Sequence, residues 1–270
     1  MKAIQIREPG GPEVLVLGDV PVPEIGPGEL LIEVKAAGVN RPDLAQRAGR
    51  YPVPADASPI PGLEVAGIVE AMGSGVAGFA PGDRVMALVH GGGYAEFCKV
   101  DHRHAIPVPQ GLSDIEAAGL PEVALTVEFN MVTRGGLKSG ETLLVHGGSS
   151  GIGSHAIARA RSLGAIAMTT SRGAEKAAYC LTMGAEHAID SSAGDWADAV
   201  MRATGGRGVD VILDMVGGDF TAANIGCLAA DGRYALISLQ GGREVTISLE
   251  AILRRRLTIT GSTLRPCRPR

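Results

Sequence analysis

The sequence lacks several features that mark particular classes of protein. It has no run of about 18 apolar residues, the length that a membrane-spanning helix needs, and no apolar signal region at its N-terminus. Its 4 cysteines are scattered without a C-x-x-C pair, which argues against a disulfide framework and against a cysteine-based metal site. The net charge is −4 and the main charged block is Arg254–Arg256, so nucleic acid is not an expected partner. These absences favour a cytoplasmic protein.

What the sequence does contain is enough apolar material for a sizeable core. Its 270 residues are 45% apolar and 20% charged, and 39 glycines gather at turns without a repeating period. The composition is therefore that of a globular protein, and the length suits two domains.

The two halves of the chain have different patterns. Up to about Val108, short Val- and Ile-rich stretches alternate with Pro- and Gly-rich turns, which predicts a small β barrel or sandwich. From about Leu120, strands alternate with helices, and the expected strands cover 142–147, 165–171, 187–190, 209–216, 233–239 and 257–262. Six strands with crossovers predict a doubly wound parallel sheet, the Rossmann architecture. We therefore expect a two-domain α/β protein, with a β domain over residues 1–120 and a Rossmann domain over residues 121–270.

A glycine-rich turn, VHGGSSGIGSHA at 145–156, stands between the first of these strands and the helix that follows. Gly148, Gly151 and Gly153 would let backbone amides approach a ligand without obstruction from a Cβ atom, and the positive end of the helix points at the same place. Tight turns between strand and helix favour glycine in any case, but this position favours a dinucleotide site. The residues assigned to the site are Gly148, Ser149, Ser150, Gly151, Ile152 and Gly153.

The end of the second strand bears on which dinucleotide is bound. Sites that prefer NAD usually have Asp or Glu there, which accepts a hydrogen bond from the ribose 2′-hydroxyl. This chain instead has Ser171, Arg172 and Lys176, a hydroxyl and two cations that suit a 2′-phosphate. The two cations could equally be solvated surface charges, so the missing carboxylate is the stronger argument. NADPH is the expected cofactor.

Two further loops are expected to contact the cofactor, because ligands of open α/β sheets bind beyond the carboxyl ends of the strands. These are the Gly-rich segments 215–219 and 238–242, although tight turns alone would also explain their glycines. The residues assigned to the cofactor here are Val216, Gly217, Ser238 and Leu239.

Several motifs follow one another in a specific order along nearly the whole chain. They include AAGVNRPDLAQRAGRYP at 36–52, PGLEVAGIVEAMG at 61–73, GGYAEF at 92–97 and VHGGSSGIG at 145–153. In these motifs the chain resembles the zinc-free quinone oxidoreductase branch of the medium-chain dehydrogenase/reductase superfamily. The resemblance implies a GroES-like N-terminal β domain and hydride transfer from a nicotinamide cofactor.

The resemblance also bears on metal binding. Zinc-dependent relatives have a Cys where this chain has Asn40 and a His where it has Leu63, and they carry a four-cysteine lobe that this sequence lacks. Asparagine and leucine cannot replace the thiolate and imidazole of a tetrahedral zinc site. No metal is therefore expected.

Without a metal to polarise the substrate, a quinone is the expected hydride acceptor, since its product is an aromatic hydroquinone. The resemblance assigns Asn40, Asp43 and Tyr51 to the substrate and nicotinamide pocket, and Thr126 to its cofactor side. Asn40 and Asp43 also fit a helix N-cap with a variant capping box. The alternatives are an enoyl or enone reductase, with Tyr51 or Asp43 as the acid, and a non-catalytic NADPH-binding protein.

The sequence departs from the family pattern in three places. Ser150 replaces a glycine, but can still donate to phosphate, and Glu128 stands where relatives often have an aromatic residue. Relatives also continue well beyond the segment at 260–265, so the chain resembles a truncated product with an incomplete β domain. The last strand, 257–262, is expected at the sheet edge, where relatives pair to form a homodimer.

Overall fold

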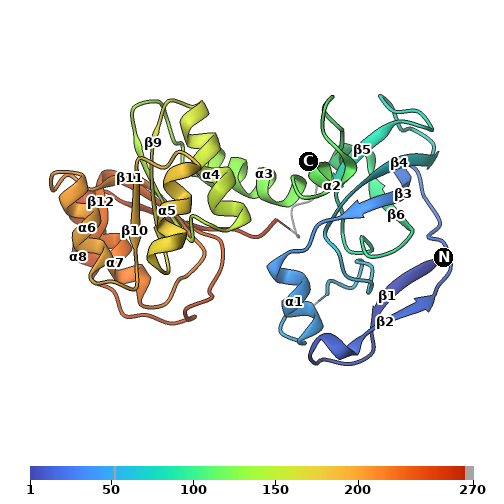
Figure 1. The fold of residues 1–270 in the computed structure, drawn as a ribbon, viewed down its shortest axis with the longest axis horizontal. Helices are drawn as coiled ribbons and strands as arrows, with labels where there is room; N and C mark the ends of the chain where they lie inside the picture. The colour runs from blue at the N-terminus through green and yellow to red at the C-terminus, as the bar shows by residue number, and fades with distance from the viewer. Residues whose placement is uncertain (52, 265–270) are drawn as a thin grey trace. The chain divides into compact units, whose positions relative to one another are not determined.

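The computed structural model describes residues 1–51 and 53–264, which form two compact units (Figure 1). Unit 1 begins at Met1 and ends at Glu122, and unit 2 begins at Val123. Cys98, Cys180 and Cys227 are free and buried, while Cys267 lies outside the described residues. No helix in the described ranges is both long and apolar enough to cross a membrane.

Unit 1 is built around a five-stranded antiparallel sheet with the strand order β6-β3-β4-β5-β7. Its strands are β3 (Glu29–Ala37), β4 (Glu64–Met72), β5 (Arg84–Leu88), β6 (Phe97–Asp101) and β7 (Ala105–Pro107). A separate antiparallel pair consists of β1 (Lys2–Ile6) and β2 (Leu15–Asp19). The helices are α1 (Arg41–Arg47) and α2 (Asp114–Ala118). Leu30 and Ile32 of β3 are fully buried and alternate with more exposed neighbours, as a strand with one face on the core requires.

Unit 2 contains a six-stranded parallel sheet with the order β10-β9-β8-β11-β12-β13. Its strands are β8 (Thr142–His146), β9 (Ile166–Ser171), β10 (His187–Asp190), β11 (Val209–Asp214), β12 (Leu228–Leu236) and β13 (Thr258–Gly261). The helices are α4 (Gly151–Ser162), α5 (Ala174–Thr182), α6 (Trp196–Ala203), α7 (Phe220–Cys227) and α8 (Leu249–Arg255). Helix α3 (Pro121–Val127) leads into a π-helical turn at Glu128–Arg134.

Both faces of the parallel sheet are covered. Leu143 and Val145 of β8 pack into one apolar cluster with Ile157 of α4, whereas Leu144 packs into a second cluster with Val200 of α6. Successive side chains of a strand point to opposite faces, so a strand covered on both sides is apolar throughout. The predicted β domain and doubly wound parallel sheet are both confirmed, and the structure shows that the sheets of the β domain are antiparallel.

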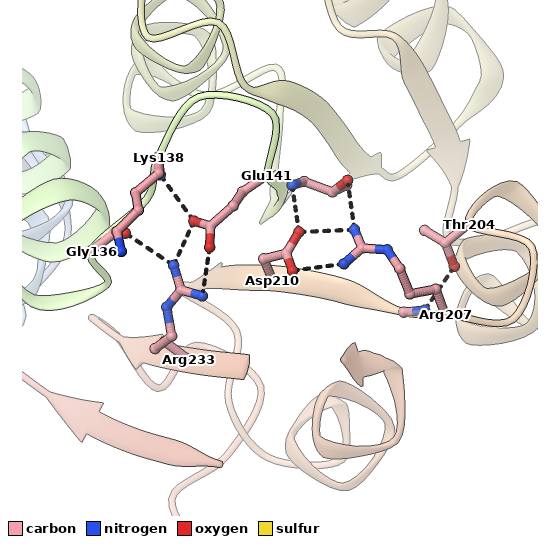
Figure 2. Close-up of polar contacts among 9 residues, drawn as sticks. Gly136, Lys138, Glu141, Thr204, Arg207, Asp210 and Arg233 are labelled. Atoms are coloured by element: carbon pink, nitrogen blue, oxygen red, sulfur yellow. Dashed lines mark hydrogen bonds and ion pairs between the residues drawn. The ribbon is translucent and has the colours of Figure 1, made fainter. Parts of the chain in front are cut away.

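A network of charged side chains joins segments at the end of the sheet where the parallel strands begin (Figure 2). Arg233 of β12 forms two hydrogen bonds with Glu141, of 2.6 and 3.0 Å, and donates to the carbonyl oxygens of Gly135 and Gly136. Arg207 binds both oxygens of Asp210, at 2.7 and 2.8 Å. These contacts lie near the amino-terminal ends of the strands. The candidate cofactor site lies at their carboxyl ends.

Candidate cofactor and substrate sites

The glycine-rich turn joins β8 to α4 and leaves amides of the helix start without partners. Ser150 is the N-cap of α4, and its hydroxyl oxygen accepts from the amide of Gly153 at 3.1 Å. Gly151 and Ile152 are the first two residues of the helix, so their amides have no intrahelical acceptor, and none is found elsewhere in the described ranges. The positive end of the helix and these two amides fit an anion such as a phosphate group.

The glycines of this turn have different physical roles. A Cβ on Gly148 would overlap the side chain of Thr169 on β9, and a Cβ on Gly153 would overlap the carbonyl oxygen of Gly147. Gly148 and Gly153 are therefore needed for packing within the turn, and their contact with a ligand stays a prediction. Gly151 is the exposed one, and only a methyl of Val123, 3.3 Å away, would be near its Cβ.

The two serines of the turn are half-buried. The hydroxyl of Ser150, which we expected to donate to phosphate, is already engaged as the helix cap and lies 3.8 Å from the sulfur of Met215. The hydroxyl thus shapes the helix start as an acceptor, and its donation to a phosphate stays a prediction. Ser149 precedes the cap and stays a predicted contact.

At the end of β9, the structure separates the three residues assigned to the 2′-phosphate. The Ser171 side chain is buried, and its oxygen lies 3.2 Å from the sulfur of Cys180 on α5. It therefore faces the protein interior, and a contact of Ser171 with the cofactor stays a prediction. Arg172 and Lys176 are both exposed. The amide of Gly173 between them donates to Asp190 at 2.8 Å, which fixes the turn into α5.

The two loops beyond β11 and β12 lie against each other. Gly217 forms an isolated parallel bridge with Gly242, and the amide of Gly241 donates to the carbonyl oxygen of Val216 at 2.7 Å. Gly217 has a φ of +66°, which side chains rarely adopt. Ser238 is half-buried and Leu239 is exposed in the second loop. Because β11 neighbours β8 in the sheet, these loops and the glycine-rich turn follow neighbouring strands.

In unit 1, two of the residues assigned to the substrate pocket form the start of α1. Asn40 is the N-cap, and its amide donates to the carboxylate of Asp43 at 2.8 Å, as the predicted capping box requires. Asp43 is 4% exposed and also accepts from the amide of Gly62 at 3.0 Å and from the hydroxyl of Tyr94 at 3.0 Å.

Glu64 and Tyr94 belong to the same cluster, although neither residue was assigned a role from the sequence. The Glu64 carboxylate accepts from the side-chain amide of Asn40 at 2.8 Å and from the amide of Glu122 at 2.8 Å. Burial raises the pKa of Glu64, and the nearby Asp43 charge raises it further. Burial, together with Asp43, also raises the pKa of Tyr94 far above its ordinary value. Both residues lie in motifs that carried the resemblance, which was the available signal.

The other two predicted residues are placed separately. Tyr51 is half-buried in the segment that follows α1. Thr126 is a buried residue of α3 in unit 2, and its carbonyl oxygen accepts from the side chain of Asn130 at 2.9 Å. The functional roles of both stay predictions.

Comparisons with known proteins agree with the fold of the two units. Residues 26–110 match the alcohol dehydrogenase GroES-like domain, and residues 151–268 match the zinc-binding dehydrogenase family. The quinone oxidoreductase of Rattus norvegicus is 33% identical over 91% of this chain and 75% of its own length. This chain belongs to the quinone oxidoreductase branch of the medium-chain dehydrogenase/reductase superfamily.

Solved structures of this superfamily share the fold. The Escherichia coli quinone oxidoreductase complexed with NADPH has a TM-score of 0.87 and 30% identity, over 97% of this chain and 81% of that one. The CurK enoyl reductase has a TM-score of 0.86 and 25% identity, over 97% of this chain and 80% of that one. Both structures therefore extend beyond the part that this chain matches.

Much longer proteins match as well. The phthioceranic/hydroxyphthioceranic acid synthase of Mycobacterium bovis is 35% identical over 87% of this chain. The match spans only 11% of the length of that synthase. The similarity therefore concerns one segment of a much longer protein.

One matched family is described as zinc-binding. In this chain, positions 40 and 63, where zinc-dependent relatives have a Cys and a His, hold Asn40 and Leu63. Asn40 binds Glu64, and Leu63 is a buried apolar residue. Within the described ranges, no three His, Cys, Asp or Glu side chains are grouped closely enough to hold a metal ion.

Glu128, the residue that departs from the family pattern, is held by Arg159 of α4. Two hydrogen bonds of 2.8 and 3.2 Å join the carboxylate to the guanidinium group, and they lower the pKa of Glu128. The charge of Glu128 is thus balanced within unit 2 by Arg159, which lies about two helical turns after the start of α4.

Proposed function

We propose that this oxidoreductase uses NADPH to reduce a quinone without a metal ion. The observation that carries the cofactor assignment is the combination of two unpartnered amides at the start of α4 with exposed cations beyond β9. Gly151 and Ile152 would bind the pyrophosphate. Arg172 and Lys176 would bind the 2′-phosphate, and β9 ends without the carboxylate that repels it.

The chain's own residues have three tasks in this reaction. NADPH, when bound, supplies the hydride. The loops that contain Val216, Gly217, Ser238 and Leu239 would close around the cofactor and exclude water. Asn40 and Asp43, held rigidly by the α1 capping box, would orient the acceptor, together with Tyr51. Thr126 would contact the nicotinamide end.

The similarity to the CurK enoyl reductase supports a second candidate, the reduction of an activated carbon–carbon double bond. This reaction needs a proton donor in addition to the hydride. The oxygens of Asp43 already accept three hydrogen bonds, so Tyr51 is the donor to test. Loss of enone turnover in Tyr51→Phe, with quinone turnover retained, would support this second activity.

The cofactor assignment is tested by fluorescence titration with NADPH and NADH. We expect Arg172→Gln and Lys176→Gln each to weaken NADPH binding about tenfold, because each removes a charge-assisted contact, and to leave NADH binding unchanged. Lys138→Gln is the matched control, since Lys138 is an exposed cation just before β8, at the end of the strand away from the proposed cofactor site. Equal losses for both cofactors would contradict the 2′-phosphate assignment.

The reaction is tested by adding a panel of quinones to the titrated samples and following the oxidation of NADPH. Oxidation that depends on the quinone supports the proposal. Saturable NADPH binding without oxidation by any quinone or enone would instead indicate a non-catalytic binding protein.

We also propose that the chain forms a homodimer through the free edge of β13. This strand is the last in the sheet order, and its Ile259 is 41% exposed. Edge strands present unpaired backbone groups that can bind another copy of the same strand.

A further inference from the structure

A hydrogen-bonded group of four polar side chains is fully buried in the core of unit 2, close to the proposed cofactor loops. They are His146 of β8, Asp214 at the end of β11, Asn224 of α7 and Tyr234 of β12, and each has an exposure of 0%. Burying polar groups costs free energy unless each finds a hydrogen-bond partner. The proposed function uses none of these four side chains.

The hydrogen bonds in this network have a defined direction. The Asn224 side chain donates to Asp214 at 3.1 Å, so its oxygen faces the Nε2 atom of His146, 2.6 Å away. Nε2 therefore carries a proton. Burial lowers the pKa of His146, which favours the neutral ring; with the proton on Nε2, the Nδ1 atom accepts from the hydroxyl of Thr170 at 2.8 Å.

The carboxylate of Asp214 is the acceptor at the centre of this network. Besides Asn224, it accepts from the hydroxyl of Tyr234 at 2.6 Å and from the backbone amides of Val216 at 2.6 Å and Gly217 at 3.1 Å. Two of the four donors thus belong to the turn that precedes α7. A buried carboxylate needs such donors, so the network and the turn depend on each other.

We propose that Asp214 and Tyr234 are positioning residues that hold the Val216–Gly217 turn in its cofactor-binding conformation. Asp214 acts directly through the two amides, and Tyr234 acts by fixing the orientation of the Asp214 carboxylate. The inference rests on the proposed function, because that function assigns this turn to the cofactor. The turn itself needs such support, since Gly217 adopts a positive φ and bridges to the neighbouring loop.

Two variants separate this role from general stability. Tyr234→Phe keeps the ring in the core and removes only the hydroxyl that donates to Asp214. Asp214→Asn keeps the shape but replaces one acceptor oxygen with a donor, which opposes the surrounding donors. Ile212→Val is the matched control, because Ile212 is equally buried on β11 and belongs to the same apolar cluster as Tyr234.

The first measurement needs no cofactor: amide hydrogen exchange of Val216 and Gly217 in the free protein. We expect exchange to become at least about tenfold faster in Tyr234→Phe and Asp214→Asn, the effect of losing a hydrogen bond to a charged group. The Ile212→Val variant should lose thermal stability without selective exchange at these two amides. Unchanged exchange in Tyr234→Phe, or the same acceleration in Ile212→Val, would overturn the proposal.

The second measurement is the dissociation constant of NADPH, which should increase about tenfold in Tyr234→Phe and stay constant in Ile212→Val. Faster exchange with unchanged NADPH binding would overturn the positioning role while leaving the proposed function intact. Absence of NADPH binding in the unaltered protein would instead refute the proposed function.

Discussion

At the scale of single residues, the effect of one methyl group depends on what surrounds it. Gly153 and Gly226 both lie within helices and carry ordinary helical backbone angles. A Cβ on Gly153 would overlap the backbone of the glycine-rich turn, whereas a Cβ on Gly226 would have open space around it. The same substitution at the two positions should therefore have opposite effects.

We expect Gly153→Ala to lower the free energy of unfolding by about 1–3 kcal/mol, because the turn must shift to admit the methyl group. Gly226→Ala should raise it by about 0.5–1 kcal/mol, since alanine restricts the unfolded chain. Urea denaturation followed by the fluorescence of Trp196, the chain's 1 tryptophan, reports on unit 2 in both variants. An unchanged free energy of unfolding in Gly153→Ala would contradict this prediction and show that the turn can shift to admit the methyl group.

Single residues also show where sequence reasoning reaches its limit. The helix start, the capping box at Asn40 and the exposed cations after β9 could be predicted, because each depends on local spacing. The direction of the Ser171 side chain could not, since a strand covered on both faces shows no alternation of polarity. The partners of Glu64 and Tyr94 come from distant segments, so no local pattern reveals them.

At the scale of elements, the order and type of the predicted strands agree with the structure, and the largest difference in strand bounds is at β12. β12 was expected at 233–239 and instead covers Leu228–Leu236. The AspGly pair within it, typical of a turn, is accommodated where Asp231 adopts a φ of 61°. The strand therefore begins before this pair. It also ends at Leu236, so Ser238 and Leu239 lie in the loop beyond it.

Arg233 illustrates how one side chain can hold several elements together. We expect Arg233→Lys to lower the free energy of unfolding by about 1.5–3 kcal/mol, because lysine cannot reproduce the paired bonds to Glu141 and the bonds to the loop after the π-helical turn. Arg256→Lys is the matched control: Arg256 binds Asp231 through two similar bonds of 2.7 Å, but both side chains are about two-thirds exposed, at 64% and 66%. Arg256→Lys should lower the free energy of unfolding by less than about 1 kcal/mol.

Trp196 fluorescence during urea denaturation again measures both arginine variants. Equal losses would mean that burial adds nothing to the Arg233 pair. In that event, the charged network in Figure 2 would be a surface feature without structural consequence.

At the scale of the whole molecule, the proposed dimer gives the sharpest test. We expect the protein to sediment as a dimer at micromolar concentration and Ile259→Lys to make it monomeric, because a charge on β13 opposes strand pairing. Ile106→Lys is the control, since Ile106 lies on β7, the edge strand of the unit 1 sheet, and is 38% exposed compared with 41% for Ile259. A monomeric parent protein, or dissociation by both variants, would contradict pairing through β13.

The capping box at the start of α1 has a consequence for attempts to change the substrate range. Asn40 and Asp43 are proposed to orient the acceptor, yet they also begin a helix and connect it to Gly62 and Glu64. A mutant library that randomises these two positions would lose most members to misfolding before any turnover could be scored. Diversity aimed at new acceptors is better introduced at neighbouring side chains that leave this scaffold intact.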